Sequence, residues 1–137
     1  MDRLGTSSMP TSERKHRILV VEDEAMISML LEDMVLDCGG ELVGPVARFD
    51  AALELARKAE FAVAVLDLNL NGTLSYPIAE VIRERGIPVI FATGYRADGV
   101  LDRFSDCPTL QKPFSQQDFA EAVAAACRED AANRCRS

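Results

Sequence analysis

The chain has 137 residues, of which 48% are hydrophobic and 27% are charged, and its net charge is −7. This length and composition predict one globular domain with a substantial core. The acidic balance argues against nucleic-acid binding, which requires a basic surface that displaces counterions. No apolar run reaches the roughly 20 residues that span a bilayer, and the N-terminus lacks the apolar segment of a signal peptide. We therefore expect a cytoplasmic protein without nucleic-acid or membrane contacts.

The four cysteines show no metal or disulfide framework. None lies in a C-x-x-C pair, and His16 is the single histidine of the chain. This spacing is poor for zinc, so we expect reduced thiols. The cysteines are Cys38, Cys107, Cys127 and Cys135.

The first quarter of the chain predicts a tail, a strand and a helix. Residues 1–16 are polar and lack periodicity, which is typical of a flexible tail. Ile18–Val21 is a short apolar run that predicts a buried strand. A helix is expected from Ala25 to the glycine pair Gly39-Gly40, which favours a helix end. The apolar face of this helix is predicted to contain Ile27, Leu30, Leu31, Met34 and Cys38.

The middle of the chain alternates strands and helices. A weak strand is expected at Leu42–Val43, and a helix from Asp50, as N-cap, to Glu60. Phe61–Leu66 predicts a strand buried on both faces, followed by an Asn/Gly-rich turn. A third helix is expected from Ser75 to Gly86, with Pro77 in its first turn. The inward residues of these two helices are predicted to be Leu53, Ala56, Ala59, Ile78, Val81 and Ile82.

The last third ends with two strands and a long helix. Val89–Ala92 predicts a buried strand and Thr109–Gln111 a brief one. The segment 96–106 between them is irregular, with at most a short helix at 100–104. Ser115 and Asp118 form a variant of the capping box that begins the last helix. Its inner face is predicted to hold Phe119, Val123 and Cys127.

Strand and helix therefore alternate five times with no repeat and no linker. This pattern predicts a single doubly wound α/β domain with a five-stranded parallel sheet and helices on both faces. In such a sheet the carboxyl ends of all strands share one edge, where ligands bind. The polar residues that follow the predicted strands are Glu22, Asp23, Asp67, Thr93 and Lys112.

The convergence of these residues favours a functional reading over a structural one. A single strand-ending aspartate is more often a turn former or a helix cap than a site, and a lone threonine or lysine is uninformative. Clustered carboxylates, however, repel one another unless a cation or a proton intervenes, and oxygen ligands suit Mg²⁺. A carboxylate can also act as a nucleophile toward a phosphoryl group, with a lysine and a hydroxyl neutralising the oxygen charge.

At this point the sequence resembles the receiver domain of the response regulators of two-component signalling. The matching segments are Val20–Glu24, Leu66–Leu68, Phe91–Tyr95 and Gln111–Phe114. The Phe-Ala-Thr-Gly-Tyr string is also similar to a subgroup of receivers that often stand alone. The resemblance implies a flavodoxin-like (βα)5 fold with strand order 2-1-3-4-5. We expect a receiver domain over residues 17–132, flanked by tails at 1–16 and 133–137.

The resemblance also implies roles for individual residues in a phosphorylation reaction. Asp67 would accept a phosphoryl group from a sensor histidine kinase or a histidine phosphotransfer protein. Thr93 would donate a hydrogen bond to that group, and Lys112 would pair with it. The Lys112-Pro113 peptide bond is expected to be cis, a form that proline allows at small cost.

A Mg²⁺ site is implied at the same place. Asp23 and Asp67 would bind the ion directly, and Glu22 more loosely, through water. The backbone carbonyl of Asn69 would be a further ligand.

One residue departs from the family pattern. The family usually has Tyr or Phe three residues before the lysine, and the rotamer of that ring reports phosphorylation; here the position is Thr109. Tyr95 or Phe104 could take its place, and we favour Tyr95 as the switch. The segment Ala97–Gly99 is glycine-interrupted in the region that many receivers use to form dimers, so a homodimer stays open as an alternative.

Three functions remain to be weighed. The first is a phospho-switch, which is not an enzyme. It would signal to an unknown downstream protein by protein–protein contact, because no DNA-binding segment is expected after Lys112. It could also serve as a phosphate sink or relay. An aspartate-nucleophile phosphatase would need a second acid two residues after Asp67, where Asn69 stands. A receiver fold that is never phosphorylated is disfavoured by the complete set of Asp23, Asp67, Thr93 and Lys112.

Overall fold

A five-stranded parallel sheet forms the centre of the molecule. The computed structural model describes residues 17–94, 104 and 106–136, with the backbone alone for 128–136. The strands are β1 (Arg17–Val21), β2 (Glu41–Val46), β3 (Val63–Asp67), β6 (Val89–Thr93) and β7 (Thr109–Gln111). Their order is β2-β1-β3-β6-β7. The predicted flavodoxin-like α/β fold, with order 2-1-3-4-5 along the chain, is confirmed.

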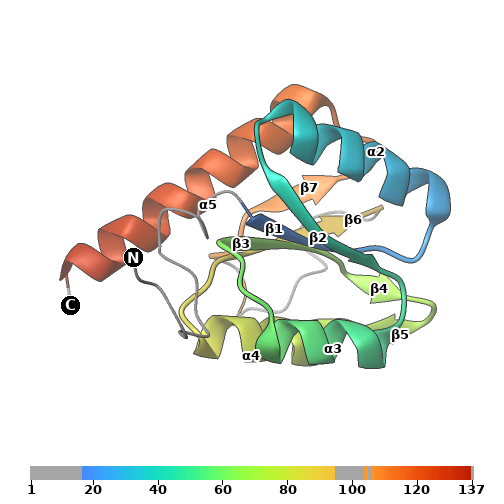
Figure 1. Cartoon of the computed structure of the whole chain (residues 1–137), viewed down its shortest axis with the longest axis horizontal. Coiled ribbons are helices and arrows are strands. Elements are labelled where there is room, and N and C mark those ends of the chain that lie inside the picture. Colours follow the sequence, from blue (N-terminus) through green and yellow to red (C-terminus); the bar gives the residue numbers. More distant parts are fainter. Residues whose placement is uncertain (1–16, 95–103, 105, 137) are drawn as a thin grey trace, which may run out of the picture.

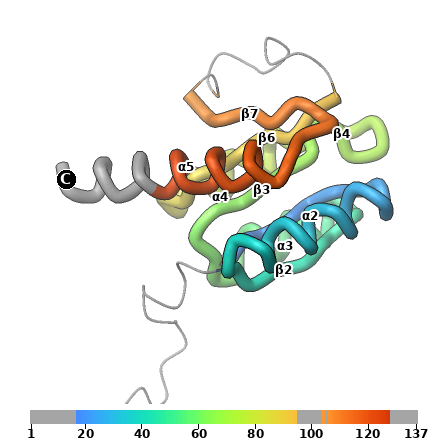
Figure 2. The backbone as a smooth tube through the Cα atoms, turned by 90° about the horizontal axis from the view of Figure 1, so that it is seen from above, coloured from blue at the N-terminus to red at the C-terminus, as the bar shows by residue number. Residues whose placement is uncertain are grey.

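Helices cover both faces of this sheet. The helices α2 (Ala25–Asp37) and α5 (Gln116–Arg136) lie on one face, and α3 (Phe49–Lys58) and α4 (Tyr76–Glu84) lie on the other (Figure 1). Seen from above, β2 and β7 lie at opposite edges of the sheet (Figure 2). The layers agree with the helix-on-both-faces arrangement that parallel sheets require.

The side chains of the central strands alternate between two hydrophobic cores. In β1, Leu19 and Val21 face the α3–α4 core, whereas Ile18 and Val20 face the α2–α5 core. All five residues of β3 are buried, as are all five of β6. This burial explains why the sequence of these strands is a continuous apolar run up to the polar residue at each carboxyl end, and not an alternating one.

One prediction about the helices is wrong, and another is confirmed only in part. Asp50 is not an N-cap, because α3 begins one residue earlier at Phe49. Asp50 instead lies in the first turn of α3, where a negative charge is favourable near the helix N-terminus. In α2 the buried residues are Leu31 and Val35, so Leu30 is exposed. Ile27, Leu31 and Met34 of the predicted apolar face do pack against the α2–α5 core, whereas Leu30 does not and Val35, which was not predicted, does. Cys38, also predicted on that face, is exposed.

Other local predictions are confirmed. Gly86 adopts the left-handed conformation, with φ of 79°, two residues after α4 ends. The capping box of α5 is present, since the Ser115 amide donates to Asp118 Oδ2 at 3.2 Å and the Asp118 amide donates to Ser115 Oγ at 3.0 Å. The Lys112-Pro113 peptide bond is cis. A second cis bond, Gly44-Pro45, is an addition to what we predicted.

The turn after β3 is a small hairpin. Strands β4 (Asn69–Leu70) and β5 (Thr73–Leu74) pair in antiparallel fashion. Asn71 and Gly72 connect them with positive φ angles of 51° and 91°, which Asn and Gly tolerate best. The predicted turn is confirmed, and the pairing of its flanks is new.

The ends of the described chain complete the comparison. Helix α5 continues to Arg136, through residues that we assigned to a C-terminal tail. The predicted domain boundaries at residues 17 and 132 stay predictions. Tyr95 and most of the segment 96–106 lie outside the described residues, as does the predicted N-terminal tail. Of the helices that the structure describes, none has the length and apolar character needed to cross a membrane.

Candidate functional site

Three carboxylates meet at the carboxyl edge of the sheet. Glu22 and Asp23 follow β1 directly, and Asp67 is the last residue of the adjacent strand β3. One side-chain oxygen of each lies within 4.8 Å of one oxygen of each of the others. Glu22 and Asp67 are buried, and Asp23 is half-buried. The structure therefore brings together the acidic residues that the sequence predicted for a metal site.

Lys112 and Thr93 approach this cluster from the next two strands. The ammonium of Lys112 lies 2.9 Å from Glu22 Oε1 and 3.4 Å from Asp67 Oδ2. Thr93 ends β6 and is buried; it follows Ala92, whose Cα is paired in register with that of Asp67. The Lys112 amide donates to the Thr93 carbonyl at 2.8 Å. A buried carboxylate, a hydroxyl residue and a cation thus lie at the same edge of the sheet, as the strand ends predicted.

The β4–β5 hairpin positions two of the carboxylates through backbone amides. The Asn71 amide donates to Asp23 Oδ2 at 3.0 Å, and the Asn69 amide donates to Asp67 Oδ1 at 3.3 Å. The Asn69 side chain is used within the hairpin, since its Oδ1 accepts a hydrogen bond from the Gly72 amide at 2.6 Å. Sequence reasoning missed the role of Asn71. The Asn71-Gly72 pair was the available signal, because it is typical of a tight hairpin turn.

The surroundings of Asp67 favour its protonated form when no cation is bound. Burial, a hydrogen bond with Asp23 and the charge of Glu22 raise the pKa of Asp67 from 3.8 to about 7, against the opposing effects of Lys112 and the Asn69 amide. Burial disfavours the charged form of Lys112 as well, but contact with Glu22 and Asp67 raises the pKa of Lys112 above its usual value. Lys112 therefore remains an ammonium while the carboxylates around it still carry an excess of negative charge.

The donor set fits a hard divalent cation. Mg²⁺ prefers carboxylate and carbonyl oxygens and keeps several of its waters. Burial, the hydrogen bond with Asp23 and the charge of Glu22 together disfavour the charged form of Asp67 and raise its pKa, and a bound cation would oppose all three effects. Asp23, the most exposed of the three acids, together with Asp67 and the adjacent Asn69, would hold the ion; Glu22 is close enough to contribute.

The predicted switch residues have different outcomes. Tyr95 lies outside the described residues. Phe104 is buried in an aromatic cluster, where its ring stacks on Tyr76 at 5.1 Å between centroids and contacts Phe91 edge-on at 5.5 Å. Three rings in mutual contact hold one another in place, so Phe104 is a packed core residue here.

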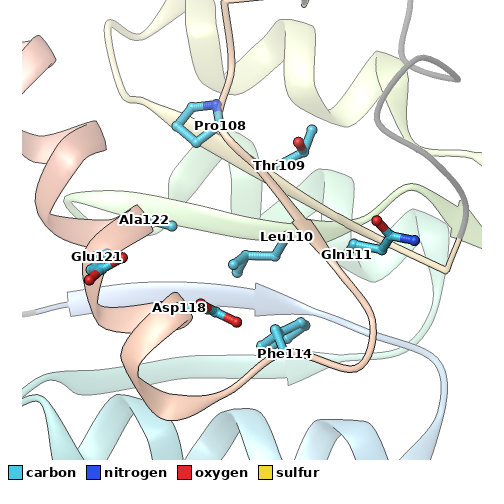
Figure 3. A pocket seen from close by; sticks show the side chains of 8 residues that line it. All are labelled: Pro108, Thr109, Leu110, Gln111, Phe114, Asp118, Glu121 and Ala122. Atoms are coloured by element: carbon cyan, nitrogen blue, oxygen red, sulfur yellow. The ribbon is translucent and has the colours of Figure 1, made fainter.

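An open pocket lies beside Thr109, the position where the family has an aromatic ring. It has a volume of about 440 Å³. Asp118, Glu121 and Ala122 of α5 form one side, and Pro108–Gln111 form the other, with Phe114 at one end (Figure 3). The pocket is connected to the site through the chain, because Lys112 directly follows β7.

Comparisons with known proteins agree with this geometry. No protein-family model matches the chain. The chain is 30% identical to the transcriptional regulatory protein PdtaR of Mycobacterium tuberculosis over 111 residues. The matched region covers 78% of this chain and 54% of PdtaR. It is 42% identical to the solved structure of SdrG from Sphingomonas melonis Fr1, with a TM-score of 0.75 and coverage of 82% of this chain and 97% of SdrG. The receiver (REC) domain of the response regulator PhyR from Erythrobacter litoralis is 28% identical, with a TM-score of 0.72 and coverage of 84% and 92%.

This chain belongs to the response-regulator receiver family. The receiver is related to proteins of different size, and it spans about half the length of PdtaR. SdrG has also been solved in a BeF3-activated conformation, to which the receiver is 42% identical with a TM-score of 0.71 and coverage of 82% of this chain and 96% of SdrG. The family places the receiver in two-component signalling, among proteins that act as switches.

Proposed function

We propose that this receiver accepts a phosphoryl group on Asp67, in a Mg²⁺-dependent reaction with a phosphohistidine of a sensor kinase or phosphotransfer protein. The observation that supports this most directly is the position of Asp67 between an ammonium and two further carboxylates at the edge of the sheet. One of its oxygens accepts a backbone hydrogen bond from Asn69, and the other faces Lys112. This orients the carboxylate for attack on phosphorus.

Lys112 and Thr93 would stabilise the phosphoryl group. Phosphoryl transfer depends mainly on positioning and on neutralising oxygen charge. The Lys112 ammonium is already 3.4 Å from Asp67, and Thr93 ends the neighbouring strand. A divalent cation held by Asp23 and Asp67 would supply the remaining positive charge. The phosphoryl group would then draw both residues toward Asp67 and change the surface beside β6 and β7.

The phosphodonor has an apolar surface available next to the crevice. Helix α2 begins two residues after Asp23, and Met26, Met29 and Leu30 are exposed there by 79%, 65% and 52%. A phosphohistidine can reach Asp67 only if its protein contacts the rim of this crevice. Exposed large apolar residues at that rim are therefore the expected contact for the donor protein.

The signal would leave through the pocket between β7 and α5. Lys112 is joined to this pocket through Pro113 and Phe114, so a shift of Lys112 toward a phosphoryl group changes one end of it. Asp118 and Glu121 place two carboxylates on its α5 side. The occupant that fits this chemistry is a downstream protein segment with a lysine or arginine on an otherwise apolar surface.

The alternative functions are less consistent with the site. A phosphatase needs a general acid two residues after the nucleophile, whereas the Asn69 side chain is an amide that is bonded within the hairpin. A phosphate sink or relay uses the same phosphorylated Asp67 and differs only in the next acceptor. An unphosphorylated interaction module would not require a half-buried lysine between two buried acids.

Direct phosphorylation tests the proposal. The protein is incubated with Mg²⁺ and a small phosphodonor, and its intact mass is measured. The same protein with beryllofluoride is followed by amide NMR, since a BeF3-activated form exists for the similar SdrG. We expect one phosphoryl adduct and a shifted spectrum, both abolished by Asp67→Asn. Absence of an adduct and of any shift in the wild type contradicts the proposal, and repeated turnover of small phosphomonoesters favours the phosphatase.

A further inference from the structure

Glu22 is the closest carboxylate to the Lys112 ammonium. The Lys112 Nζ atom lies 2.9 Å from Glu22 Oε1 but 3.4 Å from Asp67 Oδ2. The Glu22 side chain is completely buried, and its other oxygen, Oε2, accepts a hydrogen bond from the Glu24 amide at 3.1 Å. Both oxygens of Glu22 are therefore engaged with groups of this chain.

We propose that Glu22 is the resting partner of Lys112 and opposes the phosphorylated state, because it competes for the ammonium with a phosphoryl group formed on Asp67. This inference rests on the proposed phosphorylation of Asp67 and assigns Glu22 a regulatory role within it. Glu22 is thus a positioning residue, which acts on the phosphoryl group through Lys112.

The charges explain why this exchange is unfavourable without a divalent cation. A phosphoryl group carries more negative charge than a carboxylate and offers three oxygens to the ammonium, so Lys112 moves toward it. Glu22 is then a buried carboxylate without its cation, which is strongly unfavourable. A divalent ion beside Glu22 and Asp23 compensates for this loss. Cation binding and phosphoryl binding are consequently coupled, each strengthening the other by the same factor.

The length of the Glu22 side chain is essential to this arrangement. Glu22→Asp keeps the negative charge but withdraws the carboxylate by one carbon–carbon bond, about 1.5 Å. The contact of 2.9 Å with Lys112 then exceeds hydrogen-bond distance, and the ammonium is free to approach Asp67. If Glu22 acted only as a negative charge near the metal, this substitution would leave the affinity for a phosphoryl analogue unchanged.

The experiment measures beryllofluoride and Mg²⁺ affinities separately by NMR titration. Beryllofluoride is titrated at saturating Mg²⁺ into the wild type, Glu22→Asp and Glu22→Gln, and Mg²⁺ is titrated alone. Glu24→Gln is the matched control, because it removes an exposed charge two residues away and keeps the Glu24 amide. We expect Glu22→Asp to bind beryllofluoride about tenfold more tightly at saturating Mg²⁺, the effect of one charge-assisted hydrogen bond lost from the resting state.

The two variants distinguish the possible results. Glu22→Gln is expected to tighten beryllofluoride binding as well and to weaken Mg²⁺ binding, whereas Glu24→Gln should change neither appreciably. Unchanged beryllofluoride affinity in Glu22→Asp overturns the role of Glu22. If Glu22→Asp does not fold, a Glu22→Gln effect no larger than that of Glu24→Gln overturns it equally. A wild type that binds no beryllofluoride refutes the proposed function itself, which is a different outcome.

Discussion

Substituting Asp67 with asparagine should make the cation-free receiver more stable, although it removes the residue that carries the proposed function. Asp67 is 7% exposed and lies beside two other carboxylates. Its pKa is raised from 3.8 to about 7, so its charged form is unfavourable in the folded state. Asparagine has nearly the same shape and no charge. The cost of burying a charged carboxylate, and its repulsion by Glu22, are therefore absent in Asp67→Asn.

The magnitude follows from the linkage between pKa and stability. Each pKa unit corresponds to about 1.4 kcal/mol, so the difference between 3.8 and about 7 gives a ceiling of about 4 kcal/mol. The sign is a loss of stability with rising pH, because between these two values the unfolded chain releases the Asp67 proton and the folded chain retains it. The loss begins near pH 4 and is complete above pH 7.

Urea unfolding without divalent cations, at pH 5 and pH 8, measures this effect. At pH 8 we expect Asp67→Asn to have the higher midpoint, by about 1–2 M urea, and at pH 5 the difference should shrink by at least half. Adding Mg²⁺ should reduce the difference at pH 8, since a ligand of the native wild type stabilises it. Parallel pH profiles for the two proteins would refute the view that the Asp67 carboxylate is under electrostatic strain.

Three further predictions concern the residues around the site. Lys112→Ala should lower the free energy of unfolding by about 2 kcal/mol, because the buried carboxylate of Glu22 then loses its cation. Chemical denaturation tests this, and an unchanged stability would show that this ion pair contributes nothing. Met29→Lys should slow phosphotransfer from the cognate kinase about tenfold, while phosphorylation by a small donor stays normal. The control Leu36→Lys, seven residues further along α2, should leave both rates near normal. Equal effects of the two variants would exclude the α2 contact. Phe104→Ala should destabilise the fold by about 3 kcal/mol, because the aromatic cluster is lost. Thermal unfolding measures this change in stability. A loss below about 1 kcal/mol would mean that the ring contributes little packing.

Local patterns in the sequence were sufficient for most of the fold. The strands around Val20, Val65 and Ile90 are recognisable because both of their faces are buried and at least four consecutive residues of each are apolar. The capping pair Ser115 and Asp118 is readable because its hydrogen bonds connect residues only three apart. These features depend on neighbours in the chain, which the sequence displays directly.

Features that depend on distant packing could not be predicted with the same accuracy. The buried face of α2 was predicted only in part, since Leu30 and Leu31 are equally apolar and only the sheet decides which one packs. The support that Asn71 gives to Asp23 joins residues 48 positions apart and has no local signature beyond a turn. The aromatic cluster likewise joins Phe104 to Tyr76 and Phe91, which are distant in the sequence, and no local pattern indicates these contacts.

The sequence by itself determined which chemical groups meet at the site, because in a parallel sheet every strand delivers its last residue to the same edge. Asp23, Asp67 and Lys112 could therefore be identified before any coordinate was known. Only the tertiary structure decided how these groups are paired. The distances of 2.9 Å and 3.4 Å place the Lys112 ammonium closer to Glu22 than to Asp67. That preference depends on side-chain length and burial within a few ångströms, which a linear spacing of residues does not contain.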